Sequence, residues 1–265
     1  MFKRRFIPIL FLKDGWMVRS ENFSVHNYIG DPVSHVKRMV DWDVDELIVL
    51  DISGGKSKFA HHRPDFKYKP VDTLYDFINL IASECRIPLT FGGGIRSFED
   101  IKTVIKNGAD KVSVNTLLHL SPEIVLSAAK TFGKQAIVAS IDYRVNKGEA
   151  LVFCENGNIN TGKNVIEWAK HAKKYGAGEI LLNCIDRDGI AEGFDIKTID
   201  MLANSMDIPV IACGGAGIFS HFISCFSSTS ASAVAAGNIF HFKENAYPQA
   251  KKLLKSKFKN IRYQE

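Results

Sequence analysis

The feature of this sequence that most restricts its fold is a regular alternation of short apolar runs with longer amphipathic stretches. Apolar runs of about four to eight residues indicate strands, and nearly continuous apolarity indicates strands covered on both faces. We predict strands at Phe6–Leu12, Glu46–Asp51, Ile87–Phe91, Lys111–Asn115, Ala136–Asp142, Glu179–Cys184, Pro209–Cys213 and Ala231–Ala236. We predict helices between them, including Pro32–Val40, Val71–Ser83, Ser97–Asn107, Ser121–Thr131, Val165–Lys174, Ile196–Ser205 and His221–Ser227. Such a pattern predicts a closed parallel (β/α)8 barrel, the TIM-barrel architecture.

The two halves of the chain resemble each other. The segment Ile87–Ile95, which ends in a run of glycines, recurs in similar form as Ile208–Gly217. Similarity at half the chain length predicts two fused (β/α)4 units. A length of 265 residues suits one such barrel and no linker interrupts the pattern, so we expect residues 1–265 to form a single domain.

Composition narrows the classes of function. The formal net charge of +5 is modest and the basic residues are dispersed, so we expect no nucleic-acid partner, although a mild positive excess suits an anionic small ligand. No apolar stretch approaches membrane-spanning length, and the N-terminal apolar run is too short for a signal peptide. We therefore expect a cytoplasmic protein without membrane contact.

The cysteines and histidines do not suggest a metal site. The five cysteines are widely spaced and form no C-x-x-C pair, which argues against a disulfide framework or a zinc site. The loop at residues 54–70 is rich in basic and aromatic residues and contains His61 and His62. We interpret this pair as part of a solvated loop, because no acidic or cysteine partner is suitably spaced. We expect neither a metal nor another cofactor.

Two glycine-rich segments follow predicted strands and precede helices. Glycines let a backbone approach an anion closely, and helix N-termini offer free N–H donors. The first segment includes Gly94 and is joined by Asn115 and Thr116; the second includes Gly215 and is joined by Gly237 and Asn238. Each could be a simple turn, but their presence at equivalent places in the two halves favours two phosphate cradles. Two cradles predict a bis-phosphorylated small ligand.

Carboxylates also gather at predicted strand ends: Asp51, Asp142, Asp186 and Asp188. In barrel enzymes the carboxyl ends of the strands surround the active-site mouth. Asp142 ends an apolar run, and we favour a general acid or base over a helix cap or turn. Asp51 and Asp186 are weaker candidates, which could serve only to order loops.

Charged residues mark the opposite ends of four strands. Arg5, Glu46, Lys111 and Glu179 lie at or just before the starts of predicted strands one, two, four and six. Strand starts meet at the bottom of a barrel, so we expect these four side chains to form a ring there. The bottom face of this fold usually serves stability. The sequence leaves open whether the ring is a structural plug or a gate.

Together these residues resemble the cyclase subunit family of imidazole glycerol phosphate synthase, from histidine biosynthesis, over essentially the whole chain. The matching segments are Lys13–Gly15, Asp45–Leu47, Leu50–Ile52, Phe91–Ile95, Gly108–Thr116, Asn160–Gly162, Gly176–Leu182, Ile185–Gly189, Gly214–Gly217 and Phe240–Phe242. The resemblance implies a glutaminase partner at the bottom of the barrel. It also implies that ammonia passes through the barrel to a bis-phosphorylated substrate at the top.

The resemblance assigns roles position by position. It implies phosphate binding by Gly94, Asn115 and Thr116 in one half, and by Gly189, Gly215, Gly237 and Asn238 in the other. It implies that the ring of Arg5, Glu46, Lys111 and Glu179 is an ammonia gate, with a glutaminase contact near Asp110. It also implies that Asp142 is a catalytic aspartate.

One departure from the family falls at the mouth. The family has a second catalytic aspartate in the segment that here reads Leu10–Gly15, and Phe11 stands in its place. A phenyl ring cannot give or take a proton, and loss of such a group lowers a rate by about 10² to 10⁴. We expect Phe11 to lie at the substrate mouth with Asp51 and Asp188, and we expect cyclisation to be inefficient.

Three functions follow from this comparison. The preferred one is a barrel subunit that receives ammonia from a glutaminase and channels it to a sugar amidotransferase of surface-polysaccharide biosynthesis, as in paralogues that this chain resembles. The second is an active cyclase (a lyase) of histidine biosynthesis. The third is a non-catalytic subunit that only activates the glutaminase. Phe11 is the sequence feature that separates the first from the second.

Overall fold

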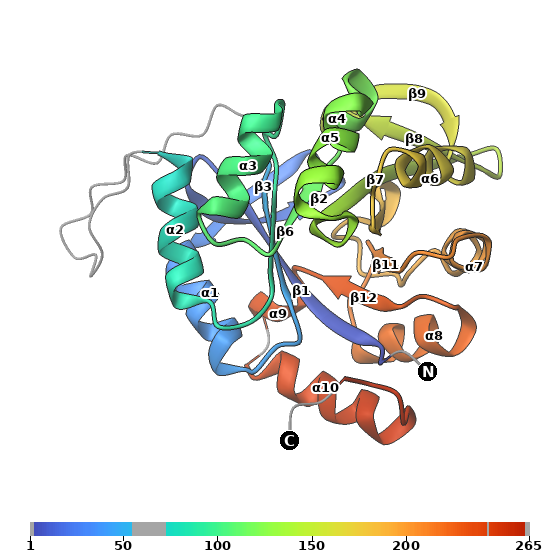
Figure 1. Ribbon diagram of the computed structural model, residues 1–265. Helices are drawn as coiled ribbons and strands as arrows, with labels where there is room; N and C mark the ends of the chain where they lie inside the picture. The colour runs from blue at the N-terminus through green and yellow to red at the C-terminus, as the bar shows by residue number, and fades with distance from the viewer. Residues whose placement is uncertain (1–2, 55–72, 243, 263–265) are drawn as a thin grey trace.

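The computed structural model describes residues 3–54, 73–242 and 244–262. Eight parallel strands form a closed barrel in the order β10-β11-β12-β1-β4-β5-β6-β7, and β10 pairs with β7 to close it (Figure 1). The strands are β1 (Arg5–Lys13), β4 (Leu47–Asp51), β5 (Leu89–Gly92), β6 (Lys111–Val114), β7 (Ile137–Asn146), β10 (Glu179–Cys184), β11 (Val210–Cys213) and β12 (Ala233–Ala236). All eight overlap the predicted strands, so the predicted (β/α)8 barrel is confirmed.

Helices surround the barrel on the outside (Figure 1). They are α1 (Pro32–Asp41), α2 (Leu74–Glu84), α3 (Phe98–Lys106), α4 (Thr116–Leu120), α5 (Pro122–Phe132), α6 (Val165–Lys174), α7 (Ile196–Ser205), α8 (Phe219–Ser228), α9 (Ile239–Phe242) and α10 (Ala246–Lys257), with short 3-10 turns η1 (Lys134–Ala136) and η2 (Ile185–Arg187). Local sequence fixes several helix starts: Ser97 and Asp100 form a capping box before α3, and Asp31 caps α1 ahead of Pro32. No helix in the described part of the chain is long and apolar enough to cross a bilayer.

The apolar core has two layers because inward and outward side chains alternate along each strand. The larger layer fills the space between the barrel and its helices. The smaller layer lies inside the barrel and includes Ile7, Ile9, Phe11, Ile48 and Leu181. The interior is therefore packed with side chains, as is usual for this fold.

Two antiparallel hairpins rise from the carboxyl ends of the barrel strands, and the sequence did not predict them. β2 (Trp16–Glu21) pairs with both β1 and β3 (Val25–Gly30). Strand β7 continues to Asn146 and pairs with β8 (Glu149–Cys154), which pairs with β9 (Ile159–Asn164). These hairpins extend the walls of the mouth.

The last helix, α10, was also not among the predicted helices. Tyr247 on α10 stacks on Phe6 with ring centroids 4.8 Å apart, and its hydroxyl donates to the Phe6 carbonyl over 2.9 Å. The same hydroxyl accepts from the backbone N–H of Asp45, whose carboxylate pairs with Lys251. This buried polar cluster fixes α10 against the amino ends of β1 and β4.

Candidate functional site

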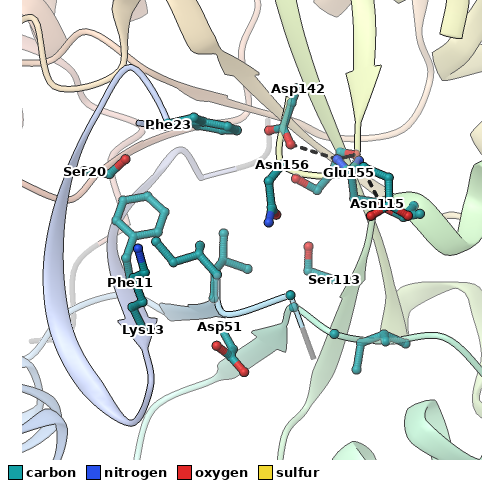
Figure 2. Close-up of a pocket in the computed structure, with 18 of the residues that line it drawn as sticks. Phe11, Lys13, Ser20, Phe23, Asp51, Ser113, Asn115, Asp142, Glu155 and Asn156 are labelled. Carbon is teal, nitrogen blue, oxygen red and sulfur yellow. Dashed lines mark hydrogen bonds between the residues drawn. The ribbon is translucent and has the colours of Figure 1, made fainter. Parts of the chain in front are cut away.

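The carboxyl ends of the strands surround a cavity of about 330 Å³. Figure 2 shows Phe11 and Lys13 on one side of it, Asn115 and Glu155 on the other, and Asp142 and Phe23 above. A second cavity of about 510 Å³ opens beside the first, and Phe11 lines both. The two cavities correspond to the first and second halves of the barrel.

Asp142 lies inside the mouth on β7 and is 9% exposed. Its neighbour across the barrel sheet is Asn183 on β10, so it lies within a strand and does not cap a helix. Its Oδ2 accepts a 2.8 Å hydrogen bond from Asn115 Nδ2, and its Oδ1 accepts a 3.4 Å bond from Asn183 Nδ2.

Burial raises the pKa of the Asp142 carboxyl from 3.8 to about 7, because a charge is poorly solvated there. The hydrogen bond from Asn183 opposes this rise, the nearby Asp188 carboxylate adds to it, and the Asn115 amide opposes it further. A carboxyl with a pKa near neutrality can both accept and donate a proton at cellular pH. The geometry of Asp142 thus suits general acid–base chemistry.

Phe11 makes the wall of the mouth opposite Asn115 apolar (Figure 2). Its side chain is 7% exposed and belongs to the apolar cluster inside the barrel. A Cβ built on Gly237 would lie 3.2 Å from the Phe11 ring, so the aromatic edge fills the space against β12. Phe11 therefore narrows the mouth and contributes no proton-transfer group.

The first glycine segment bends the chain under the first cavity. Gly93 and Gly94 have φ of 97° and 69°, and a Cβ on Gly93 would lie 1.9 Å from the Asp51 carbonyl oxygen. Only glycine fits there. Asn115 and Thr116 line the same cavity as Gly94, so the three residues proposed for the first phosphate cradle lie together.

The second glycine segment lines the second cavity. Gly215 has a φ of 102°, and a Cβ there would lie 2.1 Å from the Gly193 carbonyl oxygen. Gly189, Gly237 and Asn238 line the same cavity. The structure thus brings all seven proposed phosphate residues to two neighbouring cavities.

Asp188 and Asp51 both accept hydrogen bonds from loops or hairpins at the mouth. Asp188 accepts hydrogen bonds from the Ser20 hydroxyl at 2.7 Å and from the Phe23 backbone at 3.4 Å, which ties it to the β2–β3 hairpin. Burial raises the pKa of the Asp188 carboxyl. Asp51 lines the first cavity and accepts from the Ser53 backbone at 2.9 Å. The contact of Asp51 agrees with the loop-ordering alternative for that residue.

The four charged residues at the strand starts form a closed ring of ion pairs. Arg5 lies 3.0 Å from Glu46 and 2.5 Å from Glu179, and Lys111 lies 3.2 Å and 2.8 Å from the same two carboxylates. Burial alone would raise the pKa of the Glu179 carboxyl, but Arg5 and Lys111 hold it below its ordinary value. Arg262 joins the ring 3.5 Å from Glu46. Asp110, beside the ring, accepts from the Leu89 backbone at 2.8 Å.

Sequence reasoning missed several residues of the mouth. Arg96 and Glu155 form an ion pair in the lining of the first cavity, and Phe23 and Asn156 also line it. Arg96 directly follows the predicted glycine segment, which was an available signal, whereas the others lie on hairpins that the sequence did not reveal. Within the loop 54–70, residues 55–70, with His61 and His62, lie outside the described residues.

Comparison with known proteins supports this architecture. The family model described as "Histidine biosynthesis protein" matches residues 5–246. The chain is 38% identical to the imidazole glycerol phosphate synthase subunit HisF of Hydrogenobaculum sp. over 99% of this chain and 100% of that protein, and 39% identical to the same subunit of Geobacillus kaustophilus with equal coverage. It is 38% identical to a provisionally named imidazole glycerol phosphate synthase subunit hisF2 of Pseudomonas aeruginosa, over 96% of this chain and 99% of that protein. The chain belongs to the histidine biosynthesis protein family and resembles its HisF subunits along its whole length.

Proposed function

We propose that this chain is the barrel subunit of a glutamine amidotransferase, which receives ammonia from a glutaminase at its amino-terminal face and releases it at the mouth. The observation that carries the proposal is the ring of Arg5, Glu46, Lys111 and Glu179, whose ion pairs encircle the amino end of the barrel. Its two carboxylates are buried, but the side chains of Arg5 and Lys111 are partly exposed, so rearrangement of these cations can open a path for a small neutral molecule.

A polar side of the barrel interior continues from the ring toward the mouth. Thr90, Ser113 and Ser140 are 3%, 4% and 8% exposed and lie on the neighbouring strands β5, β6 and β7. Alternation along β6 places Ser113 on the same face as Lys111, and alternation along β7 places Ser140 on the same face as Asp142. Hydroxyl groups can exchange hydrogen bonds with ammonia. The opposite wall, from β1, β11 and β12, is apolar.

We further propose that the ammonia acceptor is a sugar held by an amidotransferase that joins the complex, and that cyclisation is inefficient. What supports this is the pairing of an intact ring with Phe11 at the mouth. The second candidate is an active cyclase of imidazole glycerol phosphate synthase, the enzyme of which the HisF relatives are named as subunits. The neutral-range pKa of Asp142 favours this candidate, since one of the two proton-transfer groups is in place.

Cyclase turnover with ammonium separates the two candidates. The purified barrel is given the ribulosyl-carboxamide bis-phosphate and excess ammonium, so that no glutaminase is required. We expect Phe11→Asp to turn over faster than the unaltered chain by about 10² or more, because it restores a second proton-transfer group. Phe23→Asp, which adds a carboxylate on the hairpin side of the same cavity, is the matched control and should remain slow. Measurable turnover by the unaltered chain, as fast as that of Phe11→Asp, would instead show an ordinary cyclase.

The ammonia route is tested separately in a complex with the glutaminase. With Phe11→Asp as the reporter, glutamine-dependent and ammonium-dependent turnover are compared before and after Thr90→Leu, because Thr90 is buried in the barrel interior and lines neither cavity. We expect the bulkier side chain to reduce glutamine-dependent turnover while ammonium supplied from solution remains effective. Equal effects on both would refute a route through the barrel.

A further inference from the structure

One buried oxygen at the mouth has no hydrogen-bond partner: Oδ1 of Asn183. Asn183 lies near the end of β10 and is 5% exposed. Two other buried side-chain atoms of the described residues lack a partner, Arg38 Nε and Asn238 Oδ1, but these belong to residues that are only partly buried. An unsatisfied buried acceptor costs about 1–3 kcal/mol. Asn183 Oδ1 is therefore a favourable place for a ligand that donates hydrogen bonds.

The side chain of Asn183 points into the barrel. Ile180 and Leu182 belong to the outer apolar layer, and Leu181 belongs to the inner one. Alternation along β10 therefore places Asn183 on the inner face. It lines the first cavity, and a Cβ on Gly214, which lines the second cavity, would lie 3.1 Å from Asn183 Oδ1. The unpartnered oxygen thus lies where the two cavities adjoin.

Asn183 also continues the polar side of the barrel interior into the mouth. Strands β6 and β10 both pair with β7, and the direct neighbour of Asn183 across the sheet is Asp142. Ser113, Ser140, Asp142 and Asn183 all line the first cavity. Ammonia that follows this side of the interior from the ring meets Asp142 and Asn183 where the barrel opens.

The side chains at this point accept more hydrogen bonds than they donate. Asn115 Nδ2 gives one N–H to the Ser140 carbonyl at 3.1 Å and the other to Asp142 Oδ2 at 2.8 Å, so both of its donors are used. Asn183 Nδ2 donates to Asp142 Oδ1 at 3.4 Å. Asn183 Oδ1 and the remaining lone pairs of the carboxylate are left as acceptors. Ammonia and ammonium are mainly donors, whereas the oxygens of a phosphate or a ketone can only accept, so this point suits the nitrogen species.

We propose that Asn183 Oδ1, with the Asp142 carboxyl beside it, forms the receiving site for ammonia at the mouth. Asn183 accepts an N–H of the incoming molecule and holds it between the two cavities, within reach of a ligand that spans both. The inference rests on the proposed function, which takes the mouth as the point where ammonia is released. It assigns the position of the nitrogen there to one named side chain.

An NMR titration with ammonium chloride tests the site directly. The side-chain amide resonances of the isotope-labelled chain are followed, with sodium chloride at equal ionic strength as the reference. The Asn183 resonance is identified by its absence from Asn183→Thr. We expect it to shift with ammonium and to saturate. The Asn238 amide is the internal control, because its oxygen is also unpartnered but lines only the second cavity; it should not shift.

Michaelis constants in the Phe11→Asp reporter give a second measurement. Asn183→Leu keeps the size of the side chain and removes its acceptor. We expect the KM for ammonium to rise about tenfold, as expected for one lost hydrogen bond, while the KM for the ribulosyl-carboxamide bis-phosphate stays within about twofold. Asn183→Thr retains a hydroxyl acceptor and should restore most of the ammonium affinity.

An Asn183 resonance that responds equally to ammonium and sodium would overturn the inference and would show that the oxygen is satisfied by water. Equal increases of both Michaelis constants in Asn183→Leu would also overturn it, because they would show a general disturbance of the mouth. The resonance titration needs no turnover and no glutaminase, so it gives an answer even if Phe11→Asp is inactive. Delivery through the barrel is decided separately by Thr90→Leu in the glutaminase complex, so failure of the route and failure of the receiving site are distinguishable.

Discussion

The buried carboxyl of Asp142 should make the stability of this protein fall as pH rises toward neutrality. Its pKa is about 7 in the folded chain and 3.8 as the ordinary value. Between these values the folded state binds more protons than the unfolded state, so the free energy of unfolding decreases with pH. A shift of about three pKa units corresponds to about 4 kcal/mol, fully lost above pH 7.

The perturbation is Asp142→Asn, which removes the titration and keeps the shape. Asparagine has one acceptor where two amides, from Asn115 and Asn183, now donate, so it also loses about 1–3 kcal/mol at every pH. Because that loss is the same at every pH, it cancels when the unfolding free energies at two pH values are subtracted. From pH 5 to pH 8, the variant should gain about 3 kcal/mol in unfolding free energy relative to the unaltered chain.

Urea unfolding followed by circular dichroism at pH 5 and pH 8 measures this difference. Asp207→Asn is the control: Asp207 lies in solvent, and its hydrogen bond with Lys173 lowers the pKa of its carboxyl. That carboxyl is ionised at both pH values in both states, so its effect should be the same at each. Equal effects of Asp142→Asn at the two pH values would refute a buried, neutral-range carboxyl.

The remaining predictions concern the ring and the first glycine segment, and both are measured by chemical denaturation. Glu179→Gln should lower the unfolding free energy by about 3 kcal/mol, because it leaves two partly buried cations with one carboxylate. The control Glu99→Gln removes an exposed ion pair and should change the unfolding free energy by at most about 0.5 kcal/mol. Similar values for both variants would refute a cooperative ring. Gly93→Ala should lower the unfolding free energy by about 3 kcal/mol or more, because the new Cβ would collide with the Asp51 carbonyl. The control Gly148→Ala is also at positive φ but in open space, and it should lower the unfolding free energy by about 1 kcal/mol. Equal losses would show that only the backbone conformation matters.

The barrel was predictable because its signals are local. Most of the barrel strands are short runs of largely apolar residues, and a charged residue at the start of a parallel strand must lie at the amino end of the barrel. Glu179, for example, directly precedes Ile180 and Leu181, so its place at the bottom follows from the order of the strands. The same reasoning located Asp142 at the mouth, five residues along β7 from Ile137.

The parts that could not be predicted depend on contacts far apart in the sequence. Strand β3 reads VHNYIG and has no alternating pattern; it is a strand because it pairs with β2, which pairs with β1. The Arg96–Glu155 pair joins residues from two different loops, and Arg262 reaches Glu46 from the other end of the chain. No spacing rule connects such residues.

The ring of ion pairs at the amino end of the barrel bears on ammonia passage, and the side chains at the mouth bear on proton transfer. Stability alone does not explain the ring, since replacing a buried ion-pair network with packed apolar side chains is often neutral or stabilising. A plug made of leucine would seal the barrel equally well. Charged side chains that can separate and re-pair suit a gate, and the polar side of the interior above them suits a passage for ammonia. The mouth, by contrast, combines a carboxyl tuned for proton transfer with Phe11, which cannot take part in it. A chain with the route that we propose and with only one of the two proton-transfer groups would be better suited to delivering ammonia than to closing a ring with it.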